Sequence, residues 1–137
     1  MSGSQSRGLF ATALLLIAIG WTGLYLLLAT TLSFLLFEAW AAVPALLFLA
    51  LGDPLSALVG RRVRIGRLGR KSLPGAVALF VVAALVGLAL SGWSEAPRFS
   101  VLLWGAVAAA LMEVLPVPLD DNLTIPLASG TVMMALA

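Results

Sequence analysis

The sequence contains no cysteine and no histidine among its 137 residues. The lack of cysteine excludes disulfides and thiolate metal sites, and the lack of histidine removes the commonest metal ligand and general base. Charge is also scarce, because only 10% of the residues are charged whereas 62% are hydrophobic, and the mean hydropathy is +1.13. So little polar surface excludes an ordinary soluble domain. The composition therefore predicts an integral membrane protein whose chemistry depends on carboxylates, Lys, Arg, hydroxyls and backbone groups.

Long apolar runs divide the chain into membrane-sized pieces. A span needs about 20 apolar residues to cross about 30 Å of hydrocarbon, which leaves room for four or five helices. We expect one all-α membrane domain over residues 1–137, a small bundle of about five transmembrane or membrane-embedded helices. The predicted helices cover residues 8–29, 31–51, 73–90, 99–115 and 123–137. Because so small a bundle encloses little space, we also expect a homo-oligomer, a dimer, in which a second copy contributes helices.

The few charged residues are not spread evenly. Four of the six carboxylates and six of the eight basic residues lie at breaks between apolar runs, at 52–53, 61–71 and 113–122. The positive-inside rule places the basic run 61–71 (RRVRIGRLGRK) in the cytoplasm, and with it the amino terminus and residues 116–122. The predicted topology thus brings the loops 52–72 and 116–122 to one face of the membrane, where we expect them to form a shared site.

The carboxylates near that face are candidate metal ligands. Glu113 lies close to the end of a span, where an ionisable group is either functional or a snorkelling side chain. Asp120 and Asp121 are adjacent like charges, which a nearby cation would stabilise, although they also suit a solvated loop that caps the last helix. Asp53 precedes a proline and suits either a metal or a helix N-cap. Mg²⁺ prefers oxygen ligands, so these four residues together predict a magnesium site.

The basic run supplies candidate phosphate ligands. Lys71 and its neighbouring arginines suit phosphates or anionic headgroups better than a nucleic acid duplex, and the helix start at Ser72 to Gly75 presents amides that attract anions. Taken alone, the same run is a common determinant of topology. Glu38 is expected in the middle or outer half of its helix, as a packing or partner contact or as a functional residue.

Three blocks of sequence and one glutamate resemble a known family. The blocks are GDPLSALVGRR at 52–62, KSLPG at 71–75 and DDNLTIPL at 120–127, with Glu113 before the last. They are similar to G-D-x-x-A-x-x-x-G-R-[RK], K-S-x-x-G-S and E…D-[DN]-N-[LF]-T-[IV]-P of the membrane lipid-alcohol kinases related to dolichol kinase, phytol kinase and the yeast-type CTP-dependent diacylglycerol kinase. The resemblance covers the chain from about Leu51 to its end.

The resemblance implies a Mg²⁺-dependent enzyme in the cytoplasmic membrane that moves the terminal phosphoryl group of CTP to the hydroxyl of a lipid alcohol, such as a polyprenol, a phytol-like alcohol or diacylglycerol. By position it implies that Asp53, Glu113 and Asp120 line the site. We expect these three to be catalytic and, with Asp121, to hold the metal. The nucleotide-binding residues that it implies are Lys71, Ser72, Gly75 and Asn122. We expect Arg61, Arg62 and Arg70 to help Lys71 hold the phosphates.

The sequence departs from the family pattern in three places. Ser56 replaces the usual Ala of the first block, Ala76 stands where the family has Ser, and the amino-terminal half is shorter than in longer members. Three alternatives stay open. The first is a CDP-lipid-forming cytidylyltransferase of the wider superfamily, although the H-G-G-x-x-D-R stretch of those enzymes is absent here. The second is a cation transporter with carboxylates near the midplane of the membrane. The third is a membrane scaffold that binds anionic lipid.

Overall fold

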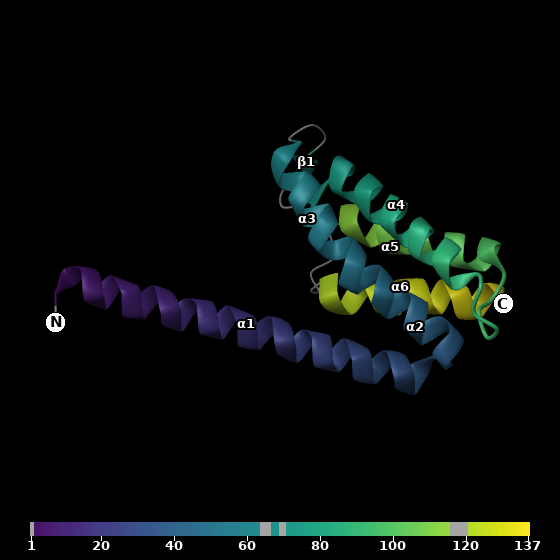
Figure 1. The fold of residues 1–137 in the computed structure, drawn as a ribbon, viewed down its shortest axis with the longest axis horizontal. Coiled ribbons are helices and arrows are strands. Elements are labelled where there is room, and N and C mark those ends of the chain that lie inside the picture. Colours follow the sequence, from purple (N-terminus) through teal and green to yellow (C-terminus); the bar gives the residue numbers. More distant parts are fainter. Residues whose placement is uncertain (1, 64–66, 69–70, 116–120) are drawn as a thin grey trace.

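A bundle of α-helices makes up the protein, as the computed structural model in Figure 1 shows. The structure describes residues 2–63, 67–68, 71–115 and 121–137, with the side chains of all of these except 67, 68, 71 and 121. Its elements are α1 (Gly3–Leu36), α2 (Ala39–Leu47), the π-helical turn η1 (Phe48–Gly52), α3 (Asp53–Arg62), β1 (Arg67–Leu68), β2 (Lys71–Ser72), α4 (Leu73–Leu90), α5 (Phe99–Val114) and α6 (Asp121–Leu136).

The first helix is longer than the prediction of 8–29, because α1 runs on to Leu36 and the next helix begins at Ala39 instead of residue 31. The predicted break fell at two threonines. Thr30 instead donates its hydroxyl proton to the Leu26 carbonyl at 2.8 Å, which satisfies the side chain within the helix. The chain turns at Phe37 and Glu38, whose backbones are extended.

Glu38 therefore lies at the junction of α1 and α2, not inside a helix as predicted. It is exposed, and its Oε2 accepts a hydrogen bond from Trp40 Nε1 at 2.6 Å.

α2, η1 and α3 form one continuous helical segment, so that the predicted loop 52–72 begins with eleven helical residues, Gly52 of η1 and the ten of α3. Pro54 has no amide proton, and its ring crowds the carbonyl one turn earlier. The π-helical turn η1 comes immediately before it, as expected where an α-helix must relax its hydrogen bonding. The Asp53 amide donates to the Leu49 carbonyl, and Gly52 makes no side-chain cap. The N-cap alternative for Asp53 is therefore wrong, because helical backbone leads directly into it.

Four segments enclose the core. The α2–η1 segment packs against α4 and α6, and α5 packs against both of these helices. Phe48, Leu79, Leu102, Ile125 and Met133 are fully buried between them. Gly105 allows a close approach of three elements, because a Cβ atom there would lie 2.7 Å from Met133 Cγ and 3.3 Å from Phe48 Cε2. These contacts set Phe48, Gly105 and Met133 at one level of the bundle.

The bundle has two distinct ends (Figure 1). At one, here called the hairpin end, α3 and α5 end and α4 and α6 begin, beside the antiparallel pair of β1 and β2. At the other, the far end, lie the α1–α2 junction and residues 91–98. The alternation of helix directions places each element at the end that the predicted topology requires.

Three of the described helical segments are long and apolar enough to cross a membrane, namely Gly3–Leu36, Ala39–Arg62 and Leu73–Leu90, while Phe99–Val114 and Asn122–Leu136 are shorter apolar helices. This architecture is compatible with the predicted all-α membrane protein. In α1, only the part after about residue 22 contacts the rest of the chain, and its first part extends away from the bundle. An apolar helix exposed all round needs a lipid environment or another protein.

Candidate functional site

The hairpin end gathers most of the buried polar side chains in the described part of the chain. Ser56 comes from α3, Ser72 from β2, Glu113 from α5 and Thr124 from α6. They come from four elements that are far apart in the sequence. Buried polar groups are costly unless they are hydrogen-bonded or bind a ligand, so their convergence marks this end as the candidate site.

Small residues allow α3 to lie close to the start of α4. A Cβ atom at Gly60 would lie 2.7 Å from Ser72 Oγ, and one at Gly75 would lie 2.7 Å from Ser72 Oγ and 3.1 Å from Ser56 Oγ. Ser72 is also the N-cap of α4, since its Oγ accepts a hydrogen bond from the Gly75 amide at 3.1 Å. The structure thus brings the first and second sequence blocks together, and it explains Ser72 and Gly75 by capping and packing alone.

The contacts at Gly105 allow the depth of each site residue to be compared. Ser56 lies eight residues beyond Phe48, Glu113 eight beyond Gly105, and Thr124 nine before Met133. At about 1.5 Å of rise per residue, these spacings correspond to about 12–14 Å along each segment toward the hairpin end. We call Ser56, Glu113 and Thr124 the polar layer. Asp53, three residues before Ser56, lies about 5 Å deeper in the bundle by the same measure.

Two hydroxyls of the polar layer stand out. Ser56 is 1% exposed and Thr124 is 7% exposed, and neither Ser56 Oγ nor Thr124 Oγ1 has a hydrogen-bond partner within the described residues. Most buried hydroxyls in proteins are paired. Both oxygens are therefore free to contact a ligand that enters the site.

The predicted carboxylates differ in their surroundings. Glu113 is the penultimate residue of α5 and only 9% exposed, and Asp53 is partly buried at the start of α3. Asn122 is partly buried in the first turn of α6. All three lie at the hairpin end. A carboxylate as buried as Glu113 is unfavourable unless it is protonated, paired or bound to a cation.

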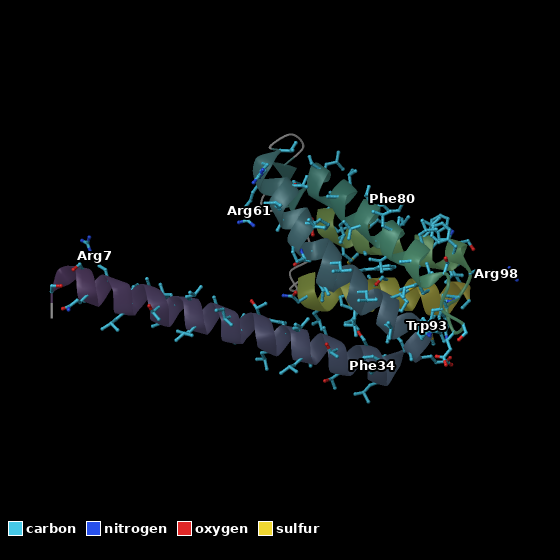
Figure 2. The ribbon with its side chains drawn as sticks, in the orientation of Figure 1. Arg7, Phe34, Arg61, Phe80, Trp93 and Arg98 are labelled. Carbon is cyan, nitrogen blue, oxygen red and sulfur yellow. The ribbon has the colours of Figure 1, made fainter. Side chains whose placement is uncertain are left out.

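Two arginines of the basic run, those with described side chains, lie at this end on a single helix. Arg61 and Arg62 are exposed in the last turn of α3, and Figure 2 shows Arg61 projecting outward there. Arg98 and Trp93 lie at the far end in the same view, and Arg7 lies near the free end of α1. Cations exposed beside a buried carboxylate suit an anionic ligand that binds from the solvent side.

Several predicted site residues lie outside the described part. Arg70 and Asp120 are not among the described residues, and only the backbones of Lys71, in β2, and Asp121, which begins α6, are described. Among the residues that are described, no three His, Cys, Asp or Glu side chains form a group able to hold a metal ion. The donor chemistry of Asp53, Glu113 and the two free hydroxyls nevertheless fits Mg²⁺, which takes oxygen ligands and keeps several of its waters.

Sequence reasoning assigned no role to two residues of the polar layer. In the sequence, Ser56 is only a departure from the family pattern, and Thr124 is only one letter of the block at 120–127. The spacing of three residues between Asp53 and Ser56 is the signal that could have indicated a shared helix face. No such signal exists for Thr124, because its depth depends on how α6 packs.

Comparison with known proteins identifies no relative: no family model, no curated protein and no solved structure matches the chain.

Proposed function

We propose that the protein transfers the terminal phosphoryl group of CTP to the hydroxyl of a membrane lipid alcohol, with Mg²⁺. The observation that carries the proposal is the polar layer, in which a buried glutamate and two free hydroxyls lie at one end of an apolar bundle, beside a basic hairpin. A polar nucleotide and an apolar alcohol can meet only where water and hydrocarbon adjoin. The sequence resemblance to lipid-alcohol kinases supports the same reaction.

The proposed placement has five membrane passes, with the hairpin end and the amino terminus in the cytoplasm of the cell and the far end outside the inner membrane. The distribution of basic residues supports it, since six of the eight lie at 61–71 and the far end has Arg98. Soluble CTP then reaches the site from the cytoplasm, and the alcohol arrives laterally within the bilayer.

Phosphoryl transfer requires positioning and charge neutralisation more than a covalent nucleophile. Lys71, with Arg61, Arg62 and Arg70, binds the phosphates of CTP in this proposal. Asp53, Glu113, Asp120 and Asp121 are the residues that would hold Mg²⁺, which would neutralise charge on the phosphates.

The reaction itself is a displacement at phosphorus. The alcohol oxygen bonds to the γ-phosphorus, the bond from that phosphorus to the β–γ bridging oxygen breaks, and CDP leaves. One of the carboxylates Asp53, Glu113 or Asp120 accepts the hydroxyl proton. Because Ser72 Oγ caps α4, we assign Ser72 a positioning role rather than direct proton transfer.

The position of Glu38 weighs against a cation transporter. That alternative requires carboxylates near the middle of the bundle, whereas Glu38 is exposed at the far end. Of the other described carboxylates, Glu95 is exposed at the far end, and Asp53 and Glu113 belong to the hairpin end.

The test uses purified protein in nanodiscs with CTP, Mg²⁺ and a panel of diacylglycerol, undecaprenol, phytol, farnesol and geranylgeraniol. Label from γ-labelled CTP should appear in a lipid, whereas label from α-labelled CTP in a lipid would indicate a cytidylyltransferase instead. Asp120→Asn and Lys71→Ala should each abolish transfer, and full activity in both variants would reject the site assignment.

The natural absence of cysteine makes the orientation simple to test. Single Arg62→Cys and Glu95→Cys variants should be labelled by impermeant maleimide from opposite sides of the membrane. Labelling of both from one side would reject the proposed topology.

We also propose a homodimer, supported by the part of α1 that contacts nothing else in the described chain. A Gly20→Cys variant should form a disulfide-linked dimer under mild oxidation in nanodiscs, and a strictly monomeric particle by mass photometry would reject this proposal.

A further inference from the structure

The first helix is about twice as long as the helices of the bundle beside it. α1 has 34 residues, whereas α4 has 18 and α5 and α6 have 16 each. At about 1.5 Å of rise per residue, α4, α5 and α6 measure roughly 24–27 Å, close to the hydrocarbon thickness of about 30 Å, whereas α1 measures roughly 51 Å. The bundle therefore matches the thickness of a membrane, and α1 exceeds it.

The excess length of α1 lies at the hairpin end (Figure 1). α1 and α6 run in the same direction, and a Cβ atom at Gly130 would collide with the ring of Phe37. Since α6 begins nine residues before Gly130, its start lies near the level of Leu28, nine residues before Phe37. Residues 8–27 then extend about 30 Å past that level, or about 19 Å if the two helices cross at about 50°.

This part of α1 is apolar on every side. Its large side chains are more than half exposed, among them Leu9, Phe10, Leu15, Ile17 and Ile19. The exposed cations Arg61 and Arg62 lie at the hairpin end, and charged side chains need water or headgroups. A straight α1 would therefore carry its apolar side chains out of the hydrocarbon and into water, which is unfavourable. The proposed dimer does not remove this conflict, because a two-fold axis along the membrane normal leaves α1 of both copies projecting from the same face.

Two features of the sequence of α1 coincide near the start of this projecting part. Gly20 and Gly23 are the only glycines after residue 8 in a helix without proline, and a Cβ atom at either would meet nothing within 4 Å. Glycine is a poor helix former, so α1 bends most easily here. Trp21 and Tyr25 lie at the same place, with their rings edge to face and the ring centroids 5.6 Å apart. Trp and Tyr are enriched at membrane–water interfaces, so this pair indicates that the interface crosses α1 beside the two glycines.

We propose that α1 bends at Gly20 and Gly23 in the bilayer, so that residues 21–36 cross the membrane and residues 8–19 lie in the lipid leaflet at the hairpin end. The crossing part then has 16 residues, as α5 and α6 do. The twelve residues 8–19 are too few to span a membrane and have the length of an interfacial or re-entrant segment. Arg7, near the free end of α1 in Figure 2, then returns to the headgroups. The inference rests on the proposed membrane placement and not on the proposed reaction.

A distance measurement tests the bend. Because the chain has no natural cysteine, spin labels can be attached to double-cysteine variants and measured in nanodiscs by pulsed electron paramagnetic resonance. Ser6→Cys with Leu36→Cys should give less than about 40 Å, and roughly 32 Å for a right-angle bend, whereas a straight α1 gives about 45 Å. Leu24→Cys with Leu36→Cys, within the crossing part, should give about 18 Å in either case. A distance of about 40 Å or more for the first pair would overturn the inference, and would indicate a straight α1 that a second copy covers.

Glycine substitutions test where the bend lies. The double variant Gly20→Ala, Gly23→Ala meets open space at both positions, and the higher helix propensity of alanine should lengthen the distance between the labels at 6 and 36 toward about 45 Å. Gly8→Ala, the matched control, also meets open space and should leave the distance unchanged. No lengthening in the double variant, or equal lengthening in the control, would overturn the assignment of the bend.

A depth measurement tests whether the amino-terminal part of α1 lies in lipid. A spin label at Leu15→Cys should be relaxed more strongly by oxygen, which concentrates in hydrocarbon, than by a water-soluble nickel chelate. The opposite preference would place the segment in water and overturn the inference. Neither result bears on transfer from CTP or on maleimide labelling at 62 and 95, so the inference and the proposed function fail separately.

Discussion

The two ends of the bundle hold their carboxylates in different surroundings. At the far end, Glu38 and Glu95 are exposed, and Glu38 accepts a hydrogen bond from Trp40. At the hairpin end, Glu113 is buried and Asp53 is partly buried. An exposed carboxylate stays hydrated at little cost, whereas a buried one must be compensated. The comparison shows that only the hairpin end holds carboxylates that need compensation, which is what the proposed site would provide.

Closely packed glycines occur at both ends, since a Cβ atom at Gly130 would collide with the ring of Phe37 beside the α1–α2 junction. Gly60 and Gly75 leave no room for a side chain where α3 meets the start of α4. Gly92, in the connection at the far end, has nothing within 4 Å of where its Cβ would lie. Close packing at the hairpin end holds the polar residues in fixed positions, as a preorganised site requires.

The largest expected effect comes from the buried carboxylate. Glu113→Gln keeps the size of the side chain but removes its charge, and should lower the rate of phosphoryl transfer about a thousandfold, within the usual range for a lost acid–base or metal-binding group. The rate of label transfer from CTP measures it. Glu95→Gln is the matched change at the far end and should be as active as the parent protein. Similar rates for the two variants would remove the functional distinction between the ends.

The next effect concerns stability. Gly75→Val would force a side chain against Ser72 and Ser56, and we expect it to lower the free energy of unfolding by about 1–3 kcal/mol, the usual range for overpacking. Gly92→Val meets open space and should change it little. Denaturation followed by circular dichroism in detergent gives both values. A stable Gly75→Val variant would show that α3 and α4 are not held together by this contact.

A smaller effect is expected from the exposed arginines. Arg62→Ala should raise KM for CTP about tenfold, through the loss of one charge-assisted contact to phosphate. Arg98→Ala, at the far end, should leave KM unchanged. The difference should shrink at high salt because exposed charges are screened. A KM for CTP that responds equally to both substitutions would exclude a phosphate site at the hairpin end.

The smallest effect compares two buried hydroxyls without partners among the described residues, Ser56 in the polar layer and Ser33 toward the far end of α1. Replacing either with Ala removes an unsatisfied buried group, so both variants should be as stable as the parent or more stable, by less than about 1 kcal/mol. Only Ser56→Ala should also raise the Mg²⁺ concentration needed for half-maximal transfer. An unchanged Mg²⁺ dependence would assign Ser56 to packing alone.

Much of the fold was accessible from sequence because apolar runs and charged breaks are local signals. The predicted helix 73–90 covers the same residues as α4, and the predicted start of the next helix, residue 99, is the start of α5. The boundary between the first two helices was wrong, since Thr30 bonds within its own helix and does not end it. The sequence left an N-cap role open for Asp53. The reason is that a π-helical turn before a proline has no local sequence pattern that distinguishes it from the start of a helix.

Part of the candidate site could also be predicted from the sequence, because the order of spans and charged breaks is a local signal. The alternation of spans predicts that Asp53, the basic run, Glu113 and Asn122 share one end, and the described residues of that set do. The depth of each residue was not accessible, because it depends on contacts between helices. Gly105 sets Phe48 and Met133 at one level, and only that register places Ser56, Glu113 and Thr124 in one layer.

The sequence by itself determined a helical, membrane-directed chain without thiol or imidazole chemistry, because these properties follow from composition and from the order of apolar and charged segments. Tertiary structure alone decided that Ser72 caps α4 and packs beside Gly60, and that Ser56, Glu113 and Thr124 are buried at the same end of the bundle. The physical reason is that close packing depends on the shapes of side chains from separate helices, and linear spacing does not contain the rotation and register with which those helices meet.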